Sequence, residues 1–214
     1  MLPESVILLG GNASDVSKKV GDKKEWEGIL LPDLNESVAS TCEHAEVPIV
    51  HVAENDVNAE LTHEAISIAS PDILIYSGSG GQIVSEKTLA LGPKFLHMHS
   101  GWLPDYRGST TLYYAMLEGK LPAVSAIILD SEIDTGPVVA QRHYPRPSTE
   151  IDIDRVYDSA IRADLMARVL VEYKTTGQLP AVESQFLHRG TPYYVIHPIL
   201  KHLSILSLRQ GRCQ

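Results

Sequence analysis

Short apolar runs alternate with segments of helical periodicity along most of this chain, and this alternation constrains the fold more than any other feature. Each apolar run predicts a buried strand, over Ser5–Gly10, Gly28–Leu31, Pro48–Val52, Asp72–Ser77, Lys94–His99, Ala123–Leu129 and Pro137–Gln141. The intervening segments suit helices, over Glu36–Ala45, Ala59–Ala69, Val84–Leu91 and Thr110–Gly119. Because such alternation is typical of βαβ units, we expect an α/β domain with a mostly parallel, twisted sheet flanked by helices.

The longest helix is expected from about Glu150 to Thr176. Thr149 and Asp152, three residues apart, match a capping box at its start, and Gly177 is a suitable stop. A chain of 214 residues is long enough for one such domain. We therefore expect a catalytic domain over residues 1–178. Residues 179–214 are read as a C-terminal tail that packs on the domain or forms an interface, with a homodimer as one candidate.

The charge of the chain argues against nucleic acid as a partner. The formal net charge is −9 and the isoelectric point is near 5.4, whereas proteins that hold DNA or tRNA by the phosphates usually present a basic face. The first residues, MLPESVILLGG, lack a basic segment, and their apolar run is too short for a signal sequence. No stretch reaches the length of a membrane span. We expect a cytoplasmic protein with no DNA or membrane partner and with tRNA disfavoured.

The segment FLHMHSGWLPDYRG, residues 95–108, holds the strongest chemical signal. His97 and His99 occupy alternate positions of a strand, so their side chains point to the same face if the strand continues through them. Asp134 follows in the loop after the next apolar strand. Either feature alone is more often structural. Together they predict one site at the carboxyl edge of the sheet, where α/β proteins bind their ligands.

Three motifs then resemble folate-dependent formyltransferases, the family of the glycinamide ribonucleotide, methionyl-tRNA and sugar N-formyltransferases. HMHSGWLPDYRG resembles the family element Asn-x-His-Pro-Ser-Leu-Leu-Pro-x-Tyr-Arg-Gly. DSEIDTGPVVAQ is similar to the family's folate-binding loop, and GGQIVSEKTL resembles the segment that lines the pterin pocket in the tRNA enzymes. The ordered match covers about residues 72–145 and implies the Rossmann-like formyltransferase fold.

The resemblance also implies a cofactor, 10-formyltetrahydrofolate, and a set of site residues. His99 and Asp134 match two members of the family's catalytic triad, and His97 stands where the family has asparagine. The cofactor would be bound by Gly81, Gln82, Ile83, Asp130, Ile133 and Asp134, and the substrate by Ser100, Gly101 and Arg107. Ser100 and Gly101 replace the family's proline and serine, so the departures lie beside the catalytic histidine.

Formyl transfer explains why such residues are needed. An amine attacks the formyl carbon, an oxyanion develops, and the amine loses a proton. His99 is a suitable acceptor for that proton, with Asp134 orienting its ring. A ring N–H of His97 can replace the asparagine amide as a donor to the oxyanion. Two adjacent histidinium charges repel each other, however, so a neutral His97 is an equal alternative.

Other readings remain open. His97 and His99 with Asp134 or His143 form a metal-site alternative, although the family match explains both histidines without a metal and we expect none. The favoured function is formyl transfer to a small amine acceptor, with a nucleotide-linked amino sugar as a candidate. A formyl-tetrahydrofolate hydrolase or related acyl transferase and a non-catalytic folate-binding relative are the alternatives.

Overall fold

The computed structural model describes residues 1–10, 24–78, 81–180, 183–185 and 190–210. Its strands are β1 Val6–Leu9, β2 Lys24–Trp26, β3 Ile29–Leu31, β4 Ile49–Val52, β5 Ile73–Tyr76, β6 Lys94–His99, β7 Tyr106–Gly108, β8 Ala123–Ile128, β9 Val138–His143 and β10 Thr191–Tyr193. Its helices are α1 Val38–His44, α2 Glu60–Ala69, α3 Glu86–Leu89, α4 Thr111–Leu117, η1 Ile153–Tyr157, α5 Asp158–Thr176 and α6 Pro198–Gln210. Every expected strand and helix is present. β2, β7, β10 and α6 were not predicted.

The central sheet has four strands in the order β5-β6-β8-β9. β5 and β6 pair in parallel, whereas β6 pairs antiparallel with β8 and β8 antiparallel with β9. The expectation of a mostly parallel sheet is therefore corrected for this sheet. Three further pairs lie outside it: parallel β1–β4, parallel β7–β10 and antiparallel β2–β3.

The connection from β6 to β8 explains the antiparallel pairing. His99, the last residue of β6, lies opposite Ser125 near the start of β8. The connecting segment, which contains β7 and α4, therefore starts and ends at the same end of the sheet. A parallel crossover would need a helix that runs back along the sheet. The alternation of strands and helices in the sequence does not distinguish these two paths.

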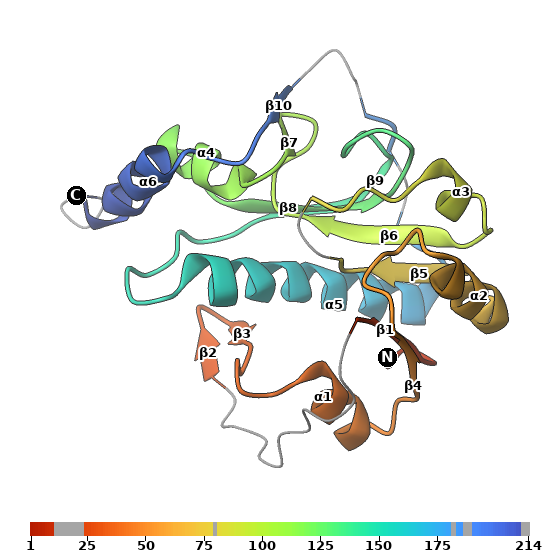
Figure 1. Ribbon diagram of the computed structural model, residues 1–214. Helices are drawn as coiled ribbons and strands as arrows, with labels where there is room; N and C mark the ends of the chain where they lie inside the picture. The colour runs from red at the N-terminus through yellow and green to blue at the C-terminus, as the bar shows by residue number, and fades with distance from the viewer. Residues whose placement is uncertain (11–23, 79–80, 181–182, 186–189, 211–214) are drawn as a thin grey trace.

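Helix α5 lies along one face of the central sheet, beneath it in Figure 1, and β7, β10, α4 and α6 lie above it. Ile161, Leu165 and Val169 of α5 are buried in the main core. A π-helical turn, η1, precedes α5, and the Asp152 carboxylate caps that turn by accepting the N–H of Arg155. Asp152 is thus the N-cap residue, and the predicted capping box of Thr149 and Asp152 is wrong.

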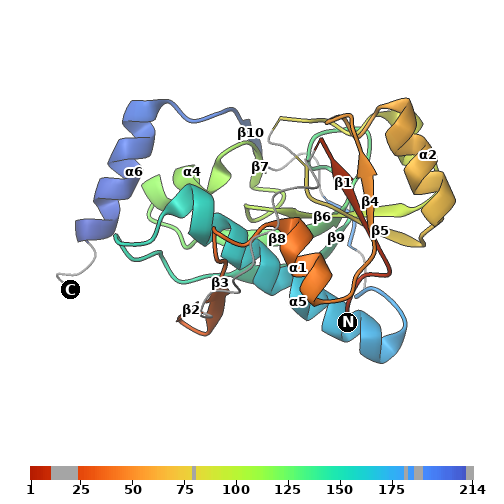
Figure 2. The same cartoon turned by 60° about the horizontal axis from the view of Figure 1, so that its bottom comes forward.

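The predicted end of α5 is confirmed, because the N–H of Gly177 donates to the carbonyl of Tyr173 with Gly177 at a φ of 73°. Glycine adopts this left-handed conformation without the steric cost that other residues incur. The β2–β3 hairpin lies near the other end of the helix (Figure 2). There the rings of Trp26 and Tyr157 meet edge to face, with 5.7 Å between their centroids.

The C-terminal segment packs on the rest of the chain through β10 and α6. β10 extends β7 in parallel, and the hydroxyl of buried Ser204 donates to the carbonyl of Tyr113 in α4 at 3.1 Å. Ile196 and Leu208 join the main core. The division at residue 178 stays a prediction.

Candidate active site

His99 ends strand β6 and is buried, with 5% of its surface exposed. Its Nε2 lies 2.7 Å from the carbonyl oxygen of Tyr106, and its Nδ1 lies 3.3 Å from Oδ2 of Asp134. A carbonyl oxygen and a carboxylate are acceptors, so both ring nitrogens face groups that require an N–H donor. In the neutral ring only one of the two nitrogens carries a hydrogen, so one of these two contacts would then lack its donor.

Asp134 lies in the loop between β8 and β9 and has a φ of 55°, which is uncommon for a residue with a side chain. Its Oδ2 also accepts the N–H of Gly108 at 2.8 Å. Because β8 is antiparallel, its carboxyl end at Ile128 lies beside Leu96 rather than at the carboxyl end of β6. The loop brings Asp134 back to the end of β6, where its carboxylate contacts His99 and Gly108.

His97 lies two residues before His99 on the same strand, with its Nδ1 3.1 Å from the carbonyl oxygen of Tyr76. Burial lowers the pKa of His97; the bond to Tyr76 and the charge of Asp134 oppose this, and the charges of His99 and Arg162 lower it further. The net direction is downward, which favours the neutral ring at neutral pH. In that ring Nδ1 carries the proton, because a carbonyl can only accept, and Nε2 carries a lone pair.

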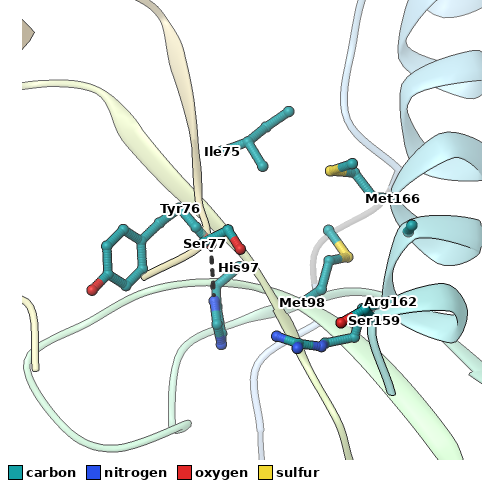
Figure 3. Close-up of a pocket in the computed structure, with 9 residues that line it drawn as sticks. Ile75, Tyr76, Ser77, His97, Met98, Ser159, Arg162 and Met166 are labelled. Atoms are coloured by element: carbon teal, nitrogen blue, oxygen red, sulfur yellow. Dashed lines mark hydrogen bonds between the residues drawn. The ribbon is translucent and has the colours of Figure 1, made fainter. Parts of the chain in front are cut away.

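A pocket of about 150 Å³ opens beside His97, between the carboxyl end of β5 and the first half of α5 (Figure 3). It is lined by Ile75, Tyr76, Ser77, His97, Met98, Ser159, Arg162, Ala163 and Met166. Figure 3 shows Arg162 reaching from α5 toward the His97 ring. The guanidinium Nη2 lies 2.7 Å from Oδ2 of Asp158, one helical turn earlier.

Sequence reasoning missed the contribution of α5 to this pocket. Arg162 is more than sixty positions from His97, and no local motif marks it. The one available signal was an Asp158–Arg162 pair at helical spacing, which is as common on solvated helix surfaces as in sites.

The two substituted positions after His99 have clear structural roles. Ser100 donates its hydroxyl to Oδ1 of Asp158, which links the end of β6 to α5. A Cβ atom at Gly101 would lie 2.6 Å from the Tyr106 carbonyl oxygen and 2.7 Å from Nε2 of His99. The His99–Tyr106 hydrogen bond therefore leaves no room for a side chain at residue 101.

Arg107, the third residue expected at the substrate, lies on β7. Its Nη2 donates to the carbonyl of Gly190 at 3.4 Å. Its Nε is buried and has no hydrogen-bond partner among the described residues. These contacts support the loop and do not direct Arg107 into the pocket beside His97.

The residues expected to bind the cofactor lie in two segments outside that pocket. Gln82 accepts the hydroxyl hydrogen of Tyr76 at 2.9 Å and donates to Oδ1 of Asp56. Among the described residues, and apart from its chain neighbours, no atom lies within 4 Å of a Cβ built on Gly81, which has a φ of 85°. In the same two segments, Asp130 accepts the hydroxyl of Thr135, and the side chains of Ile83 and Ile133 are exposed.

Within the described part of the chain, no three His, Cys, Asp or Glu side chains are grouped so that they could hold a metal ion. The metal alternative therefore has no support there. His143 stacks on Trp102 at 4.3 Å. In the same described residues no helix is both long and apolar enough to cross a membrane.

A comparison with protein families decides what kind of chain this is. The model of the formyl transferase family matches residues 8–167, which is most of the chain and includes His97, His99 and Asp134. This chain belongs to the formyl transferase family. The resemblance inferred from three motifs is confirmed, and Arg162 lies within the matched range while β10 and α6 lie beyond it.

Curated relatives of this formyl transferase family chain include methionyl-tRNA formyltransferases. That of Finegoldia magna is 27% identical over 133 residues, covering 60% of this chain and 42% of the relative. That of Lactococcus lactis is 25% identical over 167 residues, covering 77% and 49%. The chain therefore spans less than half the length of these relatives.

Solved structures of the family share the fold. The formyltransferase PseJ from Anoxybacillus kamchatkensis, in complex with UDP-4,6-dideoxy-4-formamido-L-AltNAc and tetrahydrofolate, superimposes with a TM-score of 0.58 at 16% identity. The match covers 95% of this chain and 97% of PseJ. HypX from Aquifex aeolicus, in complex with tetrahydrofolic acid, has a TM-score of 0.53 at 19% identity, covering 75% and 27%.

Proposed function

We propose that this protein transfers the formyl group of 10-formyltetrahydrofolate to the amine of a small acceptor. The observation that carries the proposal is the buried contact between His99 and Asp134 at 3.3 Å, in a chain of the formyl transferase family. This contact joins the two residues that match the family's catalytic histidine and aspartate. Family membership alone would not assign an activity.

A nucleotide-linked amino sugar is the first candidate acceptor. PseJ, whose complex contains a UDP-linked formamido sugar, matches this chain over nearly the full length of both. The net charge of −9 also offers little attraction to a polyanion. Methionyl-tRNA is the second candidate, because the curated relatives are tRNA enzymes.

The residues present fit a folate as the formyl donor. Ile83 and Ile133 expose apolar side chains, 58% and 56% exposed, that suit the faces of a flat heterocycle. The open space at Gly81 lets a ligand approach the backbone, whose N–H and C=O groups can hydrogen-bond to the polar edge of the pterin ring. Asp130 and Gln82 supply further polar atoms. The bound donor supplies the one-carbon unit that is transferred.

The test is incubation with 10-formyltetrahydrofolate and each of three mixtures: UDP-4-amino-4,6-dideoxy-L-AltNAc, methionyl-tRNA, and no amine. Donor absorbance reports turnover, and the product mass reports transfer. We expect a formylated sugar nucleotide. Equal turnover without amine would identify a hydrolase, and folate binding without any turnover would identify a non-catalytic relative.

A further inference from the structure

We propose that Nε2 of His97, and not His99, takes the proton from the attacking amine, in the pocket between β5, β6 and α5. This inference rests on the proposed function and assigns its proton-transfer step. The assignment depends on which ring nitrogens of His97 and His99 keep a free lone pair in the folded protein.

His99 has no lone pair to offer in its present contacts. Its Nε2 donates to the Tyr106 carbonyl at 2.7 Å, and its Nδ1 faces the Asp134 carboxylate at 3.3 Å. A ring that becomes neutral must give up one of these two donors, which leaves two acceptors facing each other. Gly101 packs beside this hydrogen bond, because a Cβ atom there would lie 2.7 Å from Nε2 of His99. We therefore assign His99 a positioning role.

His97 has the opposite arrangement. Its Nδ1 donates to the Tyr76 carbonyl at 3.1 Å, and Nε2 has no hydrogen-bond partner among the residues that the structure describes. His97 lines the pocket, and we place the attacking amine there, within reach of Nε2. A general base needs a lone pair within hydrogen-bond reach of the proton it removes.

The groups around His97 favour its neutral form. The Tyr76 carbonyl on β5 and the Asp134 carboxylate in the β8–β9 loop favour a charged ring. Burial, the electrostatic effect of His99 on β6 and the guanidinium of Arg162 on α5 disfavour a charged ring and prevail.

Arg162 is held in place by Asp158, which it meets at 2.7 Å and which also accepts the hydroxyl of Ser100. Ser100, the residue that replaces the family's proline, thus helps to keep a cation beside His97. Two of the three departures from the family pattern, at residues 97 and 100, thus act on the same pocket.

The step balances without a further reactant. The lone pair of the amine nitrogen forms the new bond to the formyl carbon, and one proton of that nitrogen moves to Nε2 of His97. The bond between the formyl carbon and N10 of the folate breaks, N10 keeps the electron pair, and the proton returns from His97 to N10. The products are the formamide and neutral tetrahydrofolate, and His97 is neutral again.

His97→Asn separates this role from oxyanion donation. The asparagine amide occupies about the position of Nδ1 and can still donate to Tyr76, but it has no equivalent of Nε2. If His97 were an oxyanion donor, the family's own residue should restore function. If Nε2 takes the proton, His97→Asn should lose about a hundred- to ten-thousand-fold in turnover, like His97→Ala. His51→Asn, an exposed histidine on β4, is the matched control and should retain wild-type rates.

The experiment measures kcat/KM against pH for wild type, His97→Asn and His51→Asn with 10-formyltetrahydrofolate and the amine that wild type formylates. For wild type, kcat/KM should decrease as the pH is lowered through the pKa of His97, which lies below 6.5. This decrease should be absent in His97→Asn, whereas the decrease caused by protonation of the acceptor amine should remain. Nitrogen-15 NMR of the ring should show His97 protonated only on Nδ1 and His99 protonated on both nitrogens. Folate binding to His97→Asn should stay at the wild-type level, which excludes misfolding.

Activity of His97→Asn within about tenfold of wild type, or a proton on Nε2 of neutral His97, would overturn the role of His97 alone. A wild-type protein that formylates no acceptor contradicts the proposed function and the proton-transfer role with it. In that case the NMR spectra still report the protonation of both rings. Failure of the proposed function can therefore be distinguished from failure of the His97 role alone.

Discussion

Oδ2 of Asp134 lies between Nδ1 of His99, at 3.3 Å, and the backbone N–H of Gly108, at 2.8 Å. The carboxylate therefore ties the β8–β9 loop to the end of β6 and to β7. The side chain of His99 is buried and that of Asp134 is partly buried, 6% and 12% exposed, so solvent screens the contact little.

Replacing Asp134 with asparagine should weaken this arrangement. The amide oxygen can still accept from Gly108, but His99 loses the negative charge opposite Nδ1. We expect a loss of about 1.5–3 kcal/mol in the free energy of unfolding, the usual value of a hydrogen bond to a charged group, measured by urea titration. Glu132→Gln, an exposed change in the same loop, is the control and should be neutral. Equal stability of both variants would show that the contact contributes nothing.

Gly101→Ser, which restores the family residue, should be destabilising here. The new Cβ would meet the Tyr106 carbonyl and Nε2 of His99 at 2.6 and 2.7 Å. Overpacking of this kind costs about 1–3 kcal/mol. In a double-mutant cycle the cost should be smaller in a His99→Ala background, because one of the two close contacts is then gone. An additive cycle would contradict coupling between residues 101 and 99.

Lys201 is expected to hold α6 against the domain. Its Nζ contacts the carboxylate of Asp154 and lies 5.0 Å from the centre of the Tyr113 ring. Lys201→Met should cost about 0.5–1 kcal/mol, since the pair is partly exposed, and should speed amide hydrogen exchange in α6. Lys174→Met, on exposed α5 surface, is the control. Unchanged exchange in α6 would show that the helix is held by its apolar contacts alone.

The lowered pKa of His97 predicts a pH dependence of stability. Burial, which dominates, makes the folded protein bind the His97 proton less readily than the unfolded chain. Between the folded pKa and 6.5 the unfolded chain therefore carries more protons, so the free energy of unfolding falls as the pH is lowered through this range. Urea titrations at pH 7 and pH 5 should show a larger fall for wild type than for His97→Asn. An equal decrease in the free energy of unfolding for the two proteins would mean that His97 has the same pKa in the folded and unfolded states.

Local patterns explain why much of the fold was predictable. The runs that became β5, β6 and β8 are short and apolar, and Gly177 ends α5 through its own conformation. β7 and β10 were missed because each has three residues and exists through pairing with the other, more than eighty positions away. Such pairing leaves no periodic signal in either segment.

The sequence by itself determined most elements of the fold, the family, and the presence of His97, His99 and Asp134 in ordered motifs, because these depend on residue types and short spacings. Only the tertiary structure decided that β8 runs antiparallel, that its loop returns Asp134 to His99, and that Arg162 reaches the pocket. It also decided which ring nitrogen of His97 is left with a lone pair. That choice depends on the Tyr76 carbonyl, 21 positions away, because an imidazole places its proton wherever folding brings an acceptor.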